Sequence, residues 1–334
     1  MPEVIYRIAI DRQKDILQLD LARARRAWRY SDELSPAIYK IQYQRRDYAV
    51  GSHLGGRSVP IQAHVWDVTW REKDPRGKYT SLFSTHPHWS QKVLQKFFGT
   101  YPEMLPVVLE ISGKPSYNSA DKLLGCSPYE KVFQDLDTII ALYDILPAER
   151  FFRVNGFFSK DLQNLTEHHS GWIFARGGDA YIAYRPLAPY EWIAHRIYRR
   201  IPSTTGYAYE RAPTGSKVPV SPHVKNGTIV QIASVSEFSS FEDFQKTILS
   251  LPLEFQLDPV PSVKMTTLRG KQVSVTYGEA PIVNGDPLDY TKWKLFGGTH
   301  LNTEVGGRKL TISHGNLKRV LDFNTLTISD TTHP

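Results

Sequence analysis

From residue 37 onward the chain repeats one pattern, in which short segments alternate apolar with polar residues and are rich in β-branched and aromatic types. Because successive side chains of a strand point to opposite faces, this alternation is typical of strands with one buried face. It is clearest in residues 38–52, 59–72 and 78–87, which are separated by clusters of Gly, Pro and Asp. The pattern predicts a mainly β protein, a large antiparallel β-sandwich of stacked sheets.

The first 35 residues differ from the rest, because their apolar positions recur with a spacing near 3.6. Residues 3–30 are therefore predicted to be helical, and Asp11 could divide them into two short helices. Pro36 cannot continue a helix. We expect a helical segment over residues 1–35 and a β-sandwich domain over residues 36–334.

Several shorter elements are also predicted. The segment from Gly171 indicates a hairpin around Gly177-Gly178-Asp179, where positive φ is inexpensive. Residues 198–222 are rich in Pro, Gly, Ser and Thr and are predicted to form a long exposed loop, whereas Phe241–Leu251 is predicted to be an amphipathic helix with Ser239 or Ser240 near its N-cap. The remaining strand predictions are Leu105–Ile111, Glu130–Tyr143, Phe151–Phe158, Val263–Leu268, Gln272–Tyr277, Trp293–Phe296, Leu301–Val305, Lys309–Ser313 and Val320–Phe323.

The net charge of +7 favours an anionic partner through long-range attraction. Basic residues cluster mildly at Arg23–Arg26 and Arg196–Arg200. Nucleic acid and acidic glycan are both anionic, but no helix-turn-helix, RNA-recognition or zinc-finger spacing is present. The chain also has no Walker loop, no G-x-S-x-G and no H-E-x-x-H. The missing nucleic-acid-binding spacings make nucleic acid an unexpected partner, and acidic glycan remains the other anionic partner considered.

Cysteine content and hydropathy exclude several kinds of protein. Cys126 is the only cysteine, which excludes an internal disulfide and a cysteine-based zinc cluster. No apolar run approaches the 18 residues or more of a membrane-spanning helix. The N-terminus has early charges and no apolar core, so no signal peptide is predicted.

One strand carries the first group of candidate functional residues. Gln62, His64 and Trp66 share one face by alternation, a row of polar and aromatic groups that is typical of a sugar-binding face. His53 and Arg57 lie just before it, in a glycine-rich stretch that could close over the row. The alternative is that His64 is half-buried with its hydrogen bonds satisfied and that Trp66 belongs to the core.

A second group surrounds the hairpin from Gly171. Arginine pairs bidentately with carboxylate or sulfate, so Arg176 and Arg185 are candidate ligands for an acidic sugar. The aromatic residues near them can stack on sugar rings or pack between sheets. His86 and His88, two residues apart on an extended segment, could hold Zn²⁺, and loop histidines without metal are the alternative.

Four segments together carry a family resemblance: residues 48–70, 127–145, 170–187 and 289–298. In these segments the chain resembles heparinase II/III-like proteins. The resemblance implies that this chain corresponds to the β-sandwich part of that architecture, with residues 1–30 as the last helices of an α/α toroid. The implied function is a polysaccharide lyase that acts on, or binds, uronate-containing glycan. The alternative is a non-catalytic carbohydrate-binding or structural domain of a larger heparinase-like protein.

The resemblance also suggests roles and partners. β-Elimination needs a base, an acid and a group that neutralises the uronate carboxylate. On the matching positions, His64 would be the base or a metal ligand, Tyr48 the acid and Arg57 the carboxylate clamp. Zinc or calcium would be the metal. The expected partners are acidic polysaccharide and a missing helical domain or a second copy of the chain, in an extracytoplasmic setting.

Overall fold

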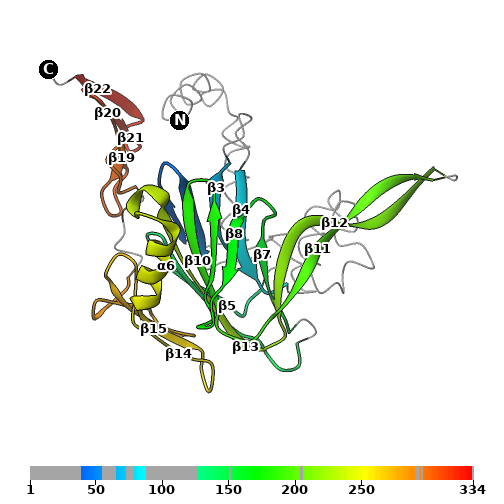
Figure 1. The fold of residues 1–334 in the computed structure, drawn as a ribbon. Coiled ribbons are helices and arrows are strands. Elements are labelled where there is room, and N and C mark those ends of the chain that lie inside the picture. Colours follow the sequence, from blue (N-terminus) through cyan, green and yellow to red (C-terminus); the bar gives the residue numbers. More distant parts are fainter. Residues whose placement is uncertain are drawn as a thin grey trace. The chain divides into compact units, whose positions relative to one another are not determined.

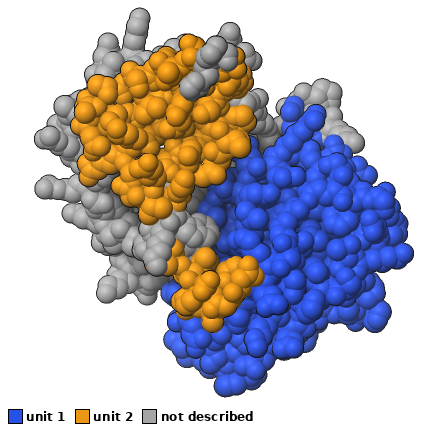
Figure 2. Space-filling model, turned by 90° about the vertical axis from the view of Figure 1, so that its left-hand side faces the viewer, with its two compact units in different colours: residues 1–279 blue, residues 280–334 orange. Residues whose placement is uncertain are grey.

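The computed structural model describes residues 39–54, 65–72, 79–87, 127–149, 152–203, 206–289, 294 and 296–332. The chain divides into two compact units, residues 1–279 and 280–334, which are coloured separately in Figure 2. The described residues are mainly strands, all paired antiparallel, so the predicted fold class is confirmed. The predicted N-terminal helical segment and the strand predicted at Leu105–Ile111 lie outside the described residues.

Two large sheets form the body of the first unit (Figure 1). The seven-stranded sheet has the order β1-β2-β3-β4-β7-β12-β11, and the six-stranded sheet has the order β5-β6-β13-β10-β9-β8. Their strands are β1 (Tyr39–Gln44), β2 (Tyr48–Leu54), β3 (Trp66–Arg71), β4 (Tyr79–Thr85), β5 (Glu130–Asp135), β6 (Thr138–Asp144), β7 (Val154–Phe158), β8 (Gln163–Glu167), β9 (Ile173–Gly177), β10 (Ala180–Pro186), β11 (Glu191–Ser203), β12 (Gly206–Ser221) and β13 (Lys225–Ser234).

Two smaller sheets follow along the chain. One has the order β14-β15-β16-β17-β18 and the other the order β19-β20-β21-β22. Their strands are β14 (Leu253–Gln256), β15 (Ser262–Thr266), β16 (Gln272–Thr276), β17 (Ile282–Val283), β18 (Asp286–Pro287), β19 (Leu301–Thr303), β20 (Lys309–His314), β21 (Leu317–Asp322) and β22 (Thr327–Thr332). The last sheet is a meander of hairpins, as the regular spacing of its turn residues predicts.

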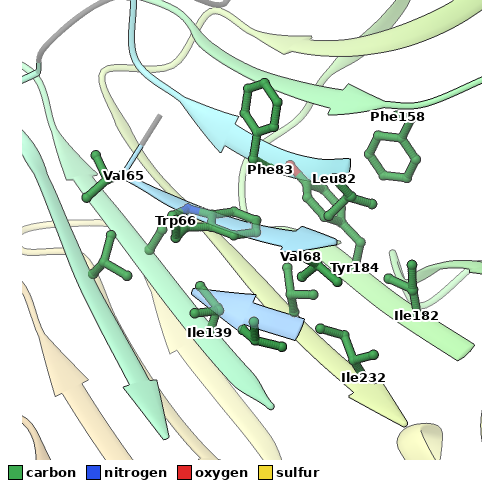
Figure 3. Close-up of a cluster of buried hydrophobic side chains, with 14 of the residues drawn as sticks. Val65, Trp66, Val68, Leu82, Phe83, Ile139, Phe158, Ile182, Tyr184 and Ile232 are labelled. Carbon is green, nitrogen blue, oxygen red and sulfur yellow. The ribbon is translucent and has the colours of Figure 1, made fainter. Parts of the chain in front are cut away.

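The hydrophobic core lies between the two large sheets. In β3 the alternation sends Trp66, Val68 and Trp70 inward, and each is at most 1% exposed. Apolar side chains of the six-stranded sheet meet them from the other side, and Figure 3 shows the two sets interleaved. This is the packing that a sandwich with one buried face per sheet requires.

The outer face of the six-stranded sheet is covered by the helix α6 (Phe241–Ser250), which confirms the predicted helix. Ser240 caps it, because its hydroxyl accepts a hydrogen bond from the Asp243 backbone N–H at 3.1 Å. Phe244 is fully buried and its ring lies 5.5 Å from that of Tyr181 on β10. The amphipathic spacing of the helix thus provides the second layer over this face.

One hairpin was predicted from its turn residues and another was missed. The hairpin predicted from Gly171 is confirmed as β9 and β10, with Gly177 paired to Ala180 and with positive φ at Gly178. The segment Glu130–Tyr143, predicted as a single strand, is instead the hairpin β5–β6. Its turn contains Leu136 at φ +51°, and a leucine gives no turn signal that sequence could reveal.

The predicted loop at residues 198–222 is wrong. This region forms the end of β11 and nearly all of β12, strands of 13 and 16 residues paired over most of their length. Composition favoured a loop, but the long cross-strand ladder outweighs it. A register shift between Ala194 and Arg196 and the positive φ of Gly215 accommodate the irregular residues.

Candidate anion-binding site

The residues that the sequence suggests for catalysis are only partly described. His64, Arg57 and Gln62 lie outside the described residues, and of His53 only the backbone, in β2, is described. Their predicted roles therefore stay predictions. The structure does place Tyr48, Trp66, Arg176 and Arg185.

Tyr48 is buried, 3% exposed, and its hydroxyl donates to Asp137 Oδ2 at 3.1 Å. Burial, followed by the charge of Asp137, raises the pKa of Tyr48. A phenol that is sealed from solvent and bonded to a buried carboxylate is not placed to protonate a sugar oxygen. The described geometry gives Tyr48 a structural role.

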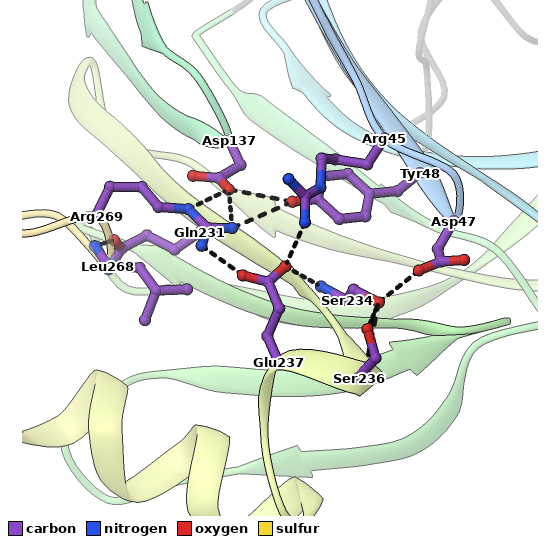
Figure 4. Close-up of polar contacts among 10 residues, drawn as sticks. All are labelled: Arg45, Asp47, Tyr48, Asp137, Gln231, Ser234, Ser236, Glu237, Leu268 and Arg269. Atoms are coloured by element: carbon purple, nitrogen blue, oxygen red, sulfur yellow. Dashed lines mark hydrogen bonds and ion pairs between the residues drawn. The ribbon is translucent and has the colours of Figure 1, made fainter.

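That role is part of a charged network in which Arg269 is central (Figure 4). Arg269 Nε lies 2.8 Å from Asp137 Oδ2, and its Nη1 pairs with Glu237. The Asp137 side chain is fully buried, and burial raises its pKa against the opposing effect of Arg269. The network joins the turns before β2 and β6 to the turn between β15 and β16. Arg269 is thus committed to two carboxylates and is not a free carboxylate clamp.

Trp66 corrects a sequence expectation. Its ring is 1% exposed in the core between the sheets, so it does not belong to an exposed sugar-binding row. The alternation correctly separates the two faces of β3, but it cannot tell whether a face meets solvent or a second sheet. Tyr48 and Trp66 therefore do not share a ligand-binding wall with Arg185, which lies on the outer face of the six-stranded sheet.

Arg176 stabilises the β9–β10 turn. Its Nε donates to Gly178 O at 2.9 Å, and its Nη2 lies 3.3 Å from Asp179 Oδ1. The guanidinium therefore already has a carbonyl and a carboxylate as partners. This leaves Arg185 as the stronger candidate of the two.

Arg185 is half-buried between two aromatic rings. Its guanidinium carbon lies 5.9 Å from the ring centre of Trp172 and 5.2 Å from that of Phe255 on β14. Its Nη1 donates to the Ser170 carbonyl, whereas its Nε is buried and has no hydrogen-bond partner among the described residues. Burial is the one cause that lowers the pKa of Arg185, and no described carboxylate pairs with it. The site thus holds a partly desolvated cation without a counter-charge in the described part of the chain.

The loop between β8 and β9 completes the site. Gly171 has φ +90°, and a Cβ there would lie 2.8 Å from Arg185 Nη1, so glycine lets the backbone approach the guanidinium. His168 Nδ1 accepts from the Ser170 backbone N–H at 3.2 Å, which leaves the ring proton on Nε2. The ring of exposed His169 lies 4.0 Å from that of His168. The backbone of this loop, at Ser170 and Gly171, therefore lies against the guanidinium.

A planar guanidinium with an unused donor can form charge-assisted hydrogen bonds to a carboxylate or sulfate. Phe255 is 38% exposed and offers a ring on which an apolar sugar face can stack. The arrangement is therefore suited to binding one anionic group of a ring-shaped ligand. We call Arg185, Trp172, Phe255 and residues 168–171 the Arg185 site.

No metal site is found among the described residues. No group of three or more His, Cys, Asp or Glu side chains in the described ranges could hold a metal ion. Of the histidine pair suggested for zinc, His86 is buried with Nδ1 2.8 Å from the Ser127 hydroxyl, and His88 lies outside the described residues. Within the same ranges, no helix combines the length and apolar character needed to cross a bilayer.

Comparison with known proteins returned no matching family model, no matching curated protein and no matching solved structure. The resemblance to heparinase II/III-like proteins therefore stays a prediction from sequence. What can be said about function rests on the geometry described above.

Proposed function

We propose that this protein binds acidic glycan and that Arg185 takes the carboxylate of a uronate unit. The observation that carries the proposal is the half-buried guanidinium held between Trp172 and Phe255, with a buried Nε–H that lacks a partner among the described residues. A carboxylate bound at the guanidinium would supply the missing counter-charge.

Desolvation makes an unpaired Arg185 unfavourable. Burying a charged group is unfavourable unless the group is paired and hydrogen-bonded. Ring contacts and one carbonyl offset part of this cost for Arg185, because cation–π contacts contribute about 0.5–2 kcal/mol. An incoming anion meets a donor fork whose orientation is already held by Gly171 and the two rings. Little side-chain freedom is then lost on binding.

A glycan fits the surroundings better than a bare inorganic anion does. The exposed ring of Phe255 lies next to the guanidinium, so one sugar unit can contact both through its ring face and its carboxylate. The net charge of +7 also favours approach of a polyanion. Sulfated sugars offer the same chemistry to Arg185, and the experiment below separates them from uronates.

The proposal concerns binding rather than β-elimination. The acid suggested by the family resemblance, Tyr48, is engaged with Asp137 in the core. The suggested base and clamp, His64 and Arg57, lie outside the described residues. Lyase activity therefore stays an expectation from sequence, which formation of unsaturated uronate products would support.

Titration calorimetry with trigalacturonate tests the proposal. We expect saturable binding that Arg185→Met weakens by about tenfold or more, since hydrogen bonds to charged groups contribute about 1.5–3 kcal/mol. Arg185→Lys keeps the charge but loses the planar fork, so its affinity should lie between the two. Arg176→Met removes an equal charge from the same hairpin and should leave affinity within about twofold.

Neutral and sulfated trisaccharides complete the experiment. Binding of trigalacturonate but not of a neutral trisaccharide supports recognition of the acidic group, and preference for the sulfated sugar would reassign the ligand to sulfate. Equal affinity of wild type and Arg185→Met for every acidic trisaccharide would refute the proposal.

A further inference from the structure

A second basic feature lies far along the β11–β12 hairpin. Beyond the register shift at Ala194, residues 196–203 of β11 and 206–213 of β12 pair only with each other among the described strands. The neighbouring strand β7 pairs with β12 only from Lys217 to Ser221. Figure 1 shows this two-stranded ribbon extending away from the sandwich. We call residues 196–203 and 206–213 the arm.

The arm combines arginine with tyrosine in a regular register. It has four arginines and one acidic residue, Glu210. Tyr198 pairs with Arg211, and Arg200 pairs with Tyr209. Because alternate positions of a strand share a face, these four residues occupy one face of the ribbon. That face therefore interleaves cationic with aromatic positions.

The opposite face differs in character. There the register pairs Ile197 with Ala212 and Arg199 with Glu210, so small apolar residues accompany one pair of opposite charge. On this face Ile197 is 51% exposed and the Glu210 side chain is exposed as well, and Arg196, which shares the face of Tyr198, is also exposed. The arm is therefore not packed against the body of the sandwich at these positions, and its basic character is confined mainly to the other face.

Charge decides which kind of partner fits. A lone two-stranded ribbon is marginally stable in water, and the outer edge of β11 has no paired strand among the described residues. Such an edge can pair with another copy of itself. If β11 paired with β11 of a second copy, Arg196, Arg199 and Arg200 of one copy would lie close to the same arginines of the other. Their charges would repel, which disfavours such a dimer and favours a polyanion as the partner of the arm.

We infer that the arm is a second contact for acidic polysaccharide, one that engages several charges along the polymer, whereas the Arg185 site engages one. The choice of polysaccharide rests on the proposed function. Positions two apart on a strand are spaced by about 6.6 Å, so the interleaved face can follow an extended chain. Arginine pairs with carboxylates and tyrosine rings stack on sugars. The arm then makes affinity depend on polymer length and on salt.

The test compares polygalacturonate with trigalacturonate at several salt concentrations. Arg196 lies two positions before Tyr198 and shares its face, so the triple variant Arg196→Gln, Arg200→Gln and Arg211→Gln removes the arginines of the interleaved face. It should reduce polymer affinity by about tenfold or more at low salt and lower the slope of log affinity against log salt by about two, taking about 0.7 per lost contact. Trigalacturonate affinity should stay unchanged, because the Arg185 site is untouched.

A charge-matched control separates this effect from net charge. Lys131, Lys246 and Lys264 are exposed and lie elsewhere in the first unit, so replacing all three with Gln should leave the salt slope within about 0.5 of wild type. An arm variant with the same polymer slope as wild type, or a wild type that binds polymer no tighter than the trimer, would overturn the inference.

Two further outcomes keep the arm and the Arg185 site distinct. Arm-dependent polymer binding without any binding of trigalacturonate would refute the role proposed for Arg185 and leave the arm contact standing. A single-stranded DNA oligomer is the competing polyanion. If it binds more tightly than polygalacturonate at equal charge, and binding is lost in the arm variant, nucleic acid replaces glycan as the partner of the arm.

Discussion

Arg269→Met should lower the free energy of unfolding by about 3–5 kcal/mol, which is the usual cost of removing one partner from a buried ion pair. The substitution leaves the fully buried Asp137 carboxylate without its cation and also removes the partner of Glu237 (Figure 4). Denaturant unfolding at neutral pH measures the loss. A loss below about 1 kcal/mol would show that this network does not hold the turns together.

The loss of unfolding free energy in Arg269→Met should become smaller as the pH falls. Burial raises the pKa of Asp137 even in the wild type, and removing Arg269 should raise it further. The variant then recovers stability by binding a proton as pH falls through that raised pKa. Glu237 acts in the same direction, because its pKa is lowered in the folded state despite burial, so the wild type loses that contribution in acid. The gap between the two proteins should therefore narrow from pH 7 to pH 4, and a widening gap would contradict this assignment.

Lys225→Met is the control for Arg269. Lys225 pairs with Asp258 at 3.1 Å, and the Asp258 side chain is 85% exposed. A pair with so exposed a carboxylate contributes at most about 1 kcal/mol. The free energy of unfolding of this control should therefore stay within about 1 kcal/mol of the wild-type value under the same conditions.

Trp66→Ala should destabilise the protein by a similar amount, about 3–5 kcal/mol, because it removes a large side chain from a close-packed core and leaves a cavity. Trp66→Phe keeps most of the ring and should cost clearly less. Thermal or denaturant unfolding measures both. If Trp66 were instead a sugar platform, Trp66→Ala would unfold like the wild type and lose glycan affinity.

Trp66 also shows how far the sequence determines the fold. Period-two spacing predicts strands in residues 38–52, 59–72 and 78–87, and most described residues of these segments are in strands. The first segment is divided by a turn at residues 45–47 into β1 and β2. The same pattern does not reveal which face meets the second sheet, because an apolar face looks alike in a core and in an exposed aromatic row. That is why the sequence left Trp66 with two interpretations, a ligand surface and the core, and the structure confirms the core.

The sequence did not predict the arm or the complete Arg185 site, and the reason differs from that for Trp66. The β11–β12 ladder depends on pairing between residues whose Pro, Gly and Ser content locally favours a loop. Arg185 could be singled out by its position beside the hairpin. Phe255, however, joins it from β14, a strand 70 residues away that periodicity did not predict. The positive φ of Gly171, which lets the loop approach Arg185, is seen only in the structure.

A crystal structure of the protein with bound trigalacturonate tests the role of Arg185 most directly. The account predicts one uronate carboxylate at hydrogen-bond distance from the Arg185 guanidinium, about 2.7–2.9 Å, with the sugar ring against Phe255. A trisaccharide bound elsewhere on the chain, with Arg185 still enclosed by Trp172 and the Ser170 carbonyl alone, would contradict it.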